Sequence, residues 1–342
     1  MRVISVRNVH QALPEGLRLL KEMGVRRNSR NGPVIVAPFP VSTVYSHPRE
    51  RVLFWPQRDA NPFLHLYESL WMLSGRNDVD PLLRYAKQFA EYSDDGKVFH
   101  GAYGYRWKRA FGLDQIDLIV RQLAANPESR REVLQMWDTH ADLSSPSKDI
   151  PCNLVITFQC SSRGDLDMVV FNRSNDIIWG AYGANAVHFS MLQEYIAHKL
   201  QRPVGTYTQV SVNYHAYCAI LERMAPIPPN QGIYGRIIDP YSGQFVRPTP
   251  LEGDLDYWIS LILYHEPFET VPTLNGTLPG WVRISFYMLH AHRLWMINEG
   301  SEKYSKALEL LECADPGIDW IAAGLQWIRR RKERWEAKGG KS

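Results

Sequence analysis

The sequence contains few cysteines and no long apolar run, and these absences exclude several classes of protein. The four cysteines of its 342 residues, Cys152, Cys160, Cys218 and Cys313, lie far apart, and no two of them form a C-x-x-C pair. This spacing argues against a disulfide framework and against a zinc site. No stretch approaches the roughly 18 apolar residues of a membrane span, and the charged N-terminal residues do not resemble a signal peptide. We therefore expect a cytoplasmic protein without a metal site.

The chain also lacks a strong charge bias, internal repeats and low-complexity segments. Its formal net charge is +3, which is too small to indicate a nucleic-acid-binding protein. With 45% hydrophobic and 22% charged residues, it has the composition of an ordinary globular protein. An enzyme that acts on a small molecule is the default class, and nucleic acid is not an expected partner.

Several segments carry apolar side chains at helical spacing. Helices are predicted over residues 15–25, 61–75 and 184–200, and three more helical segments close the chain. The first of these three begins near residue 283. We therefore predict a C-terminal helical extension over about residues 285–342.

Strand patterns occur between these helices without a regular βαβ order. The sequence RGD separates two strands and predicts a hairpin. The alternating segment after Pro203 is expected to give way to a helix from about His215. No linker is visible, so we predict one α+β domain over residues 1–342, in which a mixed sheet packs against helices.

A cluster of polar residues in the middle of the chain indicates chemistry. Cys152 follows a proline, and Arg173, Ser174 and Asp176 follow about twenty residues later. A free cysteine taken alone is most often a small buried hydrophobe. Near an arginine, however, a thiol has a lowered pKa and becomes a stronger nucleophile, and grouped arginines suit a phosphate. The cluster therefore favours a nucleophile beside an anion-binding site.

Three further groups have a functional and a structural interpretation. Glu68 faces either the interior or the solvent from its helix. Arg130 and Arg131 form a doublet at the start of a strand, which is equally typical of a solvated pair. His215 and Tyr217 share one face of a strand, where a structural pair is the alternative.

Seven segments, taken in order over roughly residues 25–225, resemble the thymidylate synthase family. FLHLYESLWMLSGRND is similar to the helix that carries the family's catalytic glutamate, here Glu68. PCN holds the nucleophile Cys152, and NRSNDIIWG resembles the family motif QRSxDxxLG. GAYGYRWKR resembles the family segment VYGxxWR, and NYHAY resembles DxHxY. The segment that runs from DQI through Arg130 and Arg131 to the following tryptophan also resembles the family, as does the position of Asn185.

The resemblance implies a fold and a reaction. The Cys152 thiolate would attack C6 of a pyrimidine nucleoside monophosphate, so that C5 takes a one-carbon unit from 5,10-methylenetetrahydrofolate. Glu68 would organise water and relay protons, and Asn185 would contact the edge of the base. Asp176 and Gly180 lie in the motif that would contact the folate.

The family also binds the phosphate and the sugar with residues from two subunits, so a sheet-to-sheet homodimer with shared active sites is implied. The implied contacts are Arg173, Ser174 and a loop arginine (Arg27 or Arg30) at the phosphate, Arg130 and Arg131 from the second subunit, and His215 and Tyr217 at the sugar hydroxyl.

Two departures from the family pattern concern water. Thymidylate synthases carry a tryptophan after the glutamate helix, whereas this chain has no tryptophan between residues 71 and 107 and offers Tyr85, Phe89 and Tyr92 instead. They also end in an apolar tail, whereas this chain ends in a basic segment. Both changes open a path for water to the methylene group formed at C5. A hydroxymethyl product is therefore favoured over a methyl product.

The base is inferred from two asparagines. Asn185 offers a donor and an acceptor to the N3 and O4 edge of uracil, which favours dUMP as substrate. Asn153 stands beside the nucleophile on the same side of the base, where the family has histidine, so dCMP and CMP remain alternatives. A thymidylate synthase, and a nucleotide-binding protein without catalysis, are the other two readings.

Overall fold

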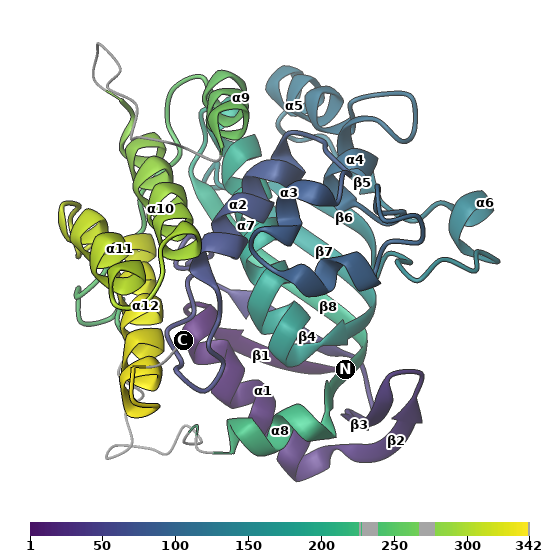
Figure 1. The fold of residues 1–342 in the computed structure, drawn as a ribbon. Helices are drawn as coiled ribbons and strands as arrows, with labels where there is room; N and C mark the ends of the chain where they lie inside the picture. The colour runs from purple at the N-terminus through teal and green to yellow at the C-terminus, as the bar shows by residue number, and fades with distance from the viewer. Residues whose placement is uncertain (226, 228–238, 267–277, 341–342) are drawn as a thin grey trace.

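The computed structural model describes residues 1–225, 227, 239–266 and 278–340, and an eight-stranded mixed sheet forms its centre (Figure 1). The strand order is β1-β4-β8-β7-β6-β5, with β3 paired to the end of β8 and β2 paired to β3. The strands are β1 (Arg2–Val6), β2 (Val25–Ser29), β3 (Gly32–Val36), β4 (Val41–Tyr45), β5 (Val133–Gln135), β6 (Asn153–Cys160), β7 (Leu166–Asp176) and β8 (Val204–Tyr217).

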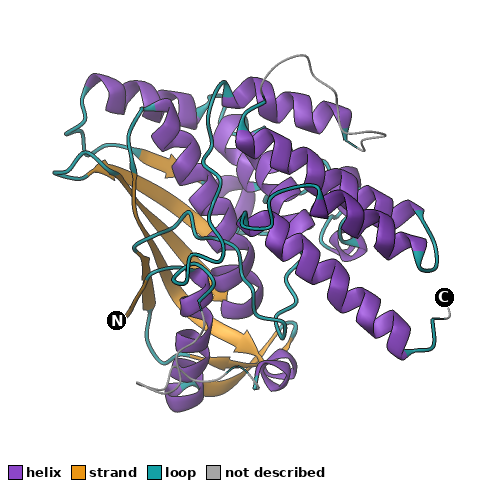
Figure 2. Ribbon diagram, turned by 90° about the vertical axis from the view of Figure 1, so that its left-hand side faces the viewer, coloured by secondary structure: helices purple, strands orange, loops and turns teal. Residues whose placement is uncertain are grey.

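The helices gather on one face of the sheet (Figure 2). This face holds the apolar core, to which β7 and β8 contribute Met168, Val170 and Tyr207. The helices are α1 (Val9–Met23), α2 (Pro62–Leu73), α3 (Asp80–Leu83), η1 (Lys87–Glu91), α4 (Tyr103–Lys108), α5 (Gln115–Ala125), α6 (Thr139–Asp142), η2 (Ile177–Ala184), α7 (Asn185–Lys199), α8 (Cys218–Met224), α9 (Leu255–His265), α10 (Gly280–Ile297), α11 (Glu302–Glu312) and α12 (Asp319–Ala337).

The two longest strands, β7 and β8, run parallel and are connected through η2 and α7. Their register places Ser174 opposite Asn213 and Asp176 opposite His215. The motif-bearing ends of both strands therefore lie side by side. The predicted hairpin between β6 and β7 is present, and Gly164 adopts a φ of +89° in its turn.

Two predicted boundaries are wrong. The helix expected from residue 15 begins at Val9, because the Asn8 side chain accepts a hydrogen bond from the Gln11 N–H and caps the helix there. The helix expected from about His215 begins at Cys218. His215 instead belongs to β8, since it pairs with Val36 of β3 and with β7.

The three helices expected at the end of the chain are present as α10, α11 and α12 (Figure 1). α10 and α12 pack against α2, and α11 packs against α10 and α12. Phe63 of α2 contacts the rings of His292 and Trp327. The buried carboxylate of Asp319 accepts a hydrogen bond from Tyr241, whose hydroxyl accepts one from the Val52 N–H. Within the described ranges, no helix is long and apolar enough to span a membrane.

Candidate active site

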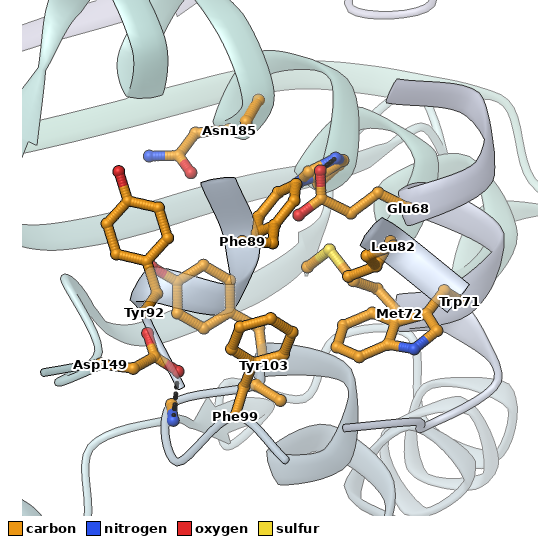
Figure 3. A pocket seen from close by; sticks show the side chains of 14 residues that line it. Glu68, Trp71, Met72, Leu82, Phe89, Tyr92, Phe99, Tyr103, Asp149 and Asn185 are labelled. Atoms are coloured by element: carbon orange, nitrogen blue, oxygen red, sulfur yellow. Dashed lines mark hydrogen bonds and ion pairs between the residues drawn. The ribbon is translucent and has the colours of Figure 1, made fainter. Parts of the chain in front are cut away.

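Two adjoining cavities contain most of the residues singled out in the sequence. The smaller cavity, of about 220 Å³, is lined by Glu68 and Asn185 (Figure 3). The larger, of about 790 Å³, is lined by Cys152. Asp149 lines both, so the two spaces meet beside the nucleophile.

Cys152 lies at the N-terminal end of β6, next to Arg173 of β7. The Arg173 N–H donates to the Cys152 carbonyl oxygen at 2.9 Å, and its guanidinium donates to the carbonyl oxygens of Pro151 and Ile150 at 2.9 and 3.1 Å. Burial raises the pKa of the Cys152 thiol, and this effect exceeds the opposing effect of Arg173 and Arg30. The expectation of a lowered pKa is therefore wrong, because burial outweighs the effect of the arginines.

The larger cavity brings together the basic and hydroxyl side chains that the sequence indicated. The β2–β3 hairpin contributes both loop arginines, Arg27 and Arg30, to the cavity lining, and which of them contacts a phosphate stays a prediction. The ends of β7 and β8 supply the other members. The cavity is lined by Arg27, Arg30, Arg173, Ser174, His215 and Tyr217, among others. Three guanidinium groups around one space form a site suited to a phosphate.

Arg130 and Arg131 lie elsewhere. Both are exposed and immediately precede the edge strand β5. Of the residues that the structure describes, those lining the Cys152 cavity do not include either arginine. Their contact with the phosphate of a second subunit stays a prediction.

A chain of buried side-chain amides fixes the orientation of Asn185. Gln209 donates its Nε2 to the Ala181 carbonyl oxygen at 3.1 Å, so its Oε1 accepts from Asn175 Nδ2 at 2.6 Å. Asn175 Oδ1 in turn accepts from Asn185 Nδ2 at 3.1 Å. Because a backbone carbonyl can only accept, the side-chain amides of Gln209, Asn175 and Asn185 each have a defined orientation. Asn185 therefore presents its carbonyl oxygen and one remaining N–H to the cavity.

Gly180 packs closely against these hydrogen-bonded side-chain amides. A Cβ atom at Gly180 would lie 2.7 Å from Asn175 Oδ1 and 3.4 Å from Asn185 Nδ2. Asp176 caps η2, where its Oδ1 accepts from the N–H groups of Ile178 and Trp179. Among the described residues lining the two cavities, neither Gly180 nor Asp176 occurs, so their folate contacts stay predictions.

Aromatic side chains form the wall of the smaller cavity opposite Asn185 (Figure 3). Of the three aromatic residues expected here, Phe89 and Tyr92 line the cavity. Tyr85 instead stacks between Tyr67 and His292, with ring centroids 4.7 and 4.5 Å apart. The sequence analysis found no tryptophan between residues 71 and 107 to occupy this site. Trp71 of the glutamate helix nevertheless lines it as well.

Asn153 and three residues that the sequence analysis did not single out complete the site. Asn153 is fully buried, and its side chain interacts with the hydroxyl group of Tyr103. Asp149 accepts from the Gly101 N–H at 2.8 Å, and burial raises its pKa. Burial and the nearby Cys152 also raise the pKa of Tyr103. His188 lies three residues after Asn185, a spacing that could have identified it as a residue on the same helix face.

Comparison with known proteins agrees with this geometry. The family model described as thymidylate synthase matches residues 17–227. The deoxyuridylate hydroxymethyltransferase of Pseudomonas phage M6 is 47% identical over 99% of this chain and 97% of its own. Proteins with the same name from Bacillus phage SP01 and Delftia phage PhiW-14 are 38% and 29% identical over 52% and 65% of this chain, and 49% and 64% of theirs. The chain belongs to the thymidylate synthase family.

Proposed function

We propose that this enzyme converts dUMP to 5-hydroxymethyl-dUMP, with 5,10-methylenetetrahydrofolate as the one-carbon donor. The activity for which the three phage relatives are named supports this reaction. The observation that carries the choice of base is the fixed amide of Asn185. Its free carbonyl oxygen accepts from N3–H of uracil and its free N–H donates to O4, whereas cytosine presents the opposite polarity at both atoms.

The larger cavity binds the rest of the nucleotide in this proposal. Arg27, Arg30 and Arg173 hold the phosphate with Ser174, and His215 and Tyr217 hold the sugar hydroxyl. The shared wall at Asp149 lets the base reach the smaller cavity while Cys152 stays within reach of C6. Attack at C6 consumes the thiolate as it forms.

The smaller cavity fits the folate. Trp71, Phe89 and Tyr92 provide flat apolar surfaces for an aromatic ring system. When bound, the folate supplies the one-carbon unit to C5. Asn153 lies beside the nucleophile, where its buried amide can bind a polar ligand atom or a water.

Water reaches the same space. The described residues that line the smaller cavity all lie between positions 68 and 188, so the C-terminal helices do not close it. Tyr92, at its edge, is 50% exposed. Water can therefore add to the C5 methylene group, which favours a hydroxymethyl over a methyl product.

We further propose that each subunit is a single domain with a C-terminal extension from about residue 285. Two such subunits associate through their sheets. Figure 2 shows one face of the sheet without helices. The strands there carry exposed apolar side chains, among them Val133, Phe171 and Val212. Arg173 shares this face with Val212. A face-to-face dimer brings the exposed Arg130 and Arg131 of one subunit toward the phosphate site of the other.

The experiment that tests the proposed function compares dUMP, dCMP, UMP and CMP with methylenetetrahydrofolate by mass spectrometry. We expect dUMP to gain about 30 Da, the mass of CH2O, with tetrahydrofolate as the second product. Preference for dCMP or CMP contradicts the base assignment. A gain of about 14 Da with dihydrofolate identifies a thymidylate synthase, and no reaction with any nucleotide identifies a binding protein without catalysis.

A further inference from the structure

His188 lies beside Glu68 in the smaller cavity. Nε2 of His188 is 3.3 Å from Oε2 of Glu68, and both side chains line the cavity together with Asn185. Glu68 belongs to α2, whereas His188 and Asn185 lie three residues apart on α7, the helix packed against it. A carboxylate, an imidazole and the base-reading amide therefore face one space, into which Figure 3 shows Glu68 and Asn185 pointing.

Among the described residues, Glu68 is the carboxylate within ion-pair distance of His188. Its side chain is 4% exposed, and Nε2 has no well-directed hydrogen bond to any described residue. Buried polar atoms normally have a partner, so Nε2 requires Glu68 or a water in the cavity. The ring of His65 meets His188 edge-on at 6.3 Å. Burial lowers the pKa of His65, and the charge of Arg58 lowers it further, so His65 stays neutral.

We propose that His188 is the positioning residue for Glu68 during water addition, an inference that rests on the proposed function. The Nε2–H of His188 donates to Oε2 of Glu68. This bond fixes the orientation of the carboxylate and directs Oε1 toward a water beside the nucleotide. Glu68 is then a general base with a fixed orientation.

The proposed addition of water conserves atoms and electrons. The water oxygen forms a bond to the methylene carbon on C5, and its proton passes to Glu68 Oε1. The electron pair of the methylene double bond moves through C5 to O4. It then returns to form the C5–C6 double bond, and the Cys152 sulfur leaves C6 as thiolate. Glu68 releases the proton to solvent.

The test is a single turnover with enzyme in excess over dUMP that carries tritium at C5. Tritium release reports the steps up to loss of the C5 proton, and 5-hydroxymethyl-dUMP in quenched samples reports water addition. In the wild type the two follow one another closely. His188→Leu should release tritium within about threefold of the wild-type rate but form product about a hundredfold more slowly.

His188→Gln separates positioning from other roles, because its amide Nε2 can donate to Glu68 but cannot act as a base. We expect it to restore product formation to within about tenfold of wild type. His198→Gln, on the same helix but bonded to Gly253 outside the cavity, is the matched control and should alter neither step.

Each outcome decides the inference. If His188→Leu slows both steps equally or neither, or if His188→Gln is as slow as His188→Leu, the positioning role is wrong while the proposed function stands. If the wild type forms a methyl product or none, the proposed function fails and the inference fails with it.

Discussion

The side-chain amide of Asn185 donates a hydrogen bond to Oδ1 of Asn175, 3.1 Å away. Asn175 is itself fixed by Gln209 and by Ser211 Oγ at 3.0 Å. In the proposed function, the preference for uracil therefore depends on this buried network as well as on Asn185 itself.

Replacing Asn185 by aspartate should change the base preference. A carboxyl group accepts from the cytosine amino group but, when ionised, has no N–H to donate to uracil O4. A mispaired buried group costs about 1–3 kcal/mol, so Asn185→Asp should shift kcat/KM toward dCMP by at least about tenfold. Competition between dUMP and dCMP measures the ratio. An unchanged ratio would show that Asn185 does not select the base.

Cys152→Ser should abolish turnover and tritium release from C5 while leaving dUMP binding largely intact. The hydroxyl group is a far weaker nucleophile than the thiolate at neutral pH. Cys160→Ser is the matched control, since Cys160 lies at the other end of β6 and should tolerate serine. Activity of the Cys152 variant within about tenfold of wild type would rule out its assignment as the nucleophile.

Mixed subunits test the shared active site. Cys152→Ser and Arg131→Ala chains should each be inactive or nearly so. After subunit exchange, each heterodimer contains one site with both residues intact, so activity should partly return. The measurement needs proof of exchange, for example by native mass spectrometry. Exchange without any recovery of activity would show that Arg131 does not act across the interface.

The pKa of Asp319 predicts a pH dependence of stability. Burial raises this pKa from an ordinary value of 3.8 to about 7, so between these values the folded chain binds a proton that the unfolded chain releases. Stability contributed by the protonated acid is therefore lost as pH rises from about 4 to about 7. Asp319→Asn removes this loss. The difference in Tm between the variant and the wild type should therefore grow over that pH interval and level off above it.

Thermal unfolding of both chains at several pH values measures this difference. One pKa unit corresponds to about 1.4 kcal/mol, so the plateau is at most about 4 kcal/mol. A difference in Tm that does not vary with pH would mean that Asp319 is ionised at all these pH values or does not titrate with folding.

Local patterns predicted the elements that carry the motifs. The glutamate helix begins where Asn61 accepts hydrogen bonds from Phe63 and Leu64 and ends near Gly75, which has a φ of +74°. The hairpin turn likewise follows from its glycine. These features depend on residues close in sequence, and a single chain displays them directly.

Features set by distant contacts were harder to predict. His215 extends β8 because β3 and β7 pair with it, and these partners are more than thirty residues away. Burial of Cys152 reverses the expected direction of its pKa shift. His188 becomes a candidate only because α7 packs against α2 beside Glu68.

The central claim is that water, not hydride, completes the reaction at C5. The most direct measurement runs wild-type enzyme with dUMP and methylenetetrahydrofolate in water enriched in oxygen-18. We expect tetrahydrofolate and a hydroxymethyl product about 2 Da heavier than the product formed in ordinary water, because its hydroxyl oxygen comes from solvent. A methyl product without the heavy oxygen, formed together with an equal amount of dihydrofolate, would contradict it.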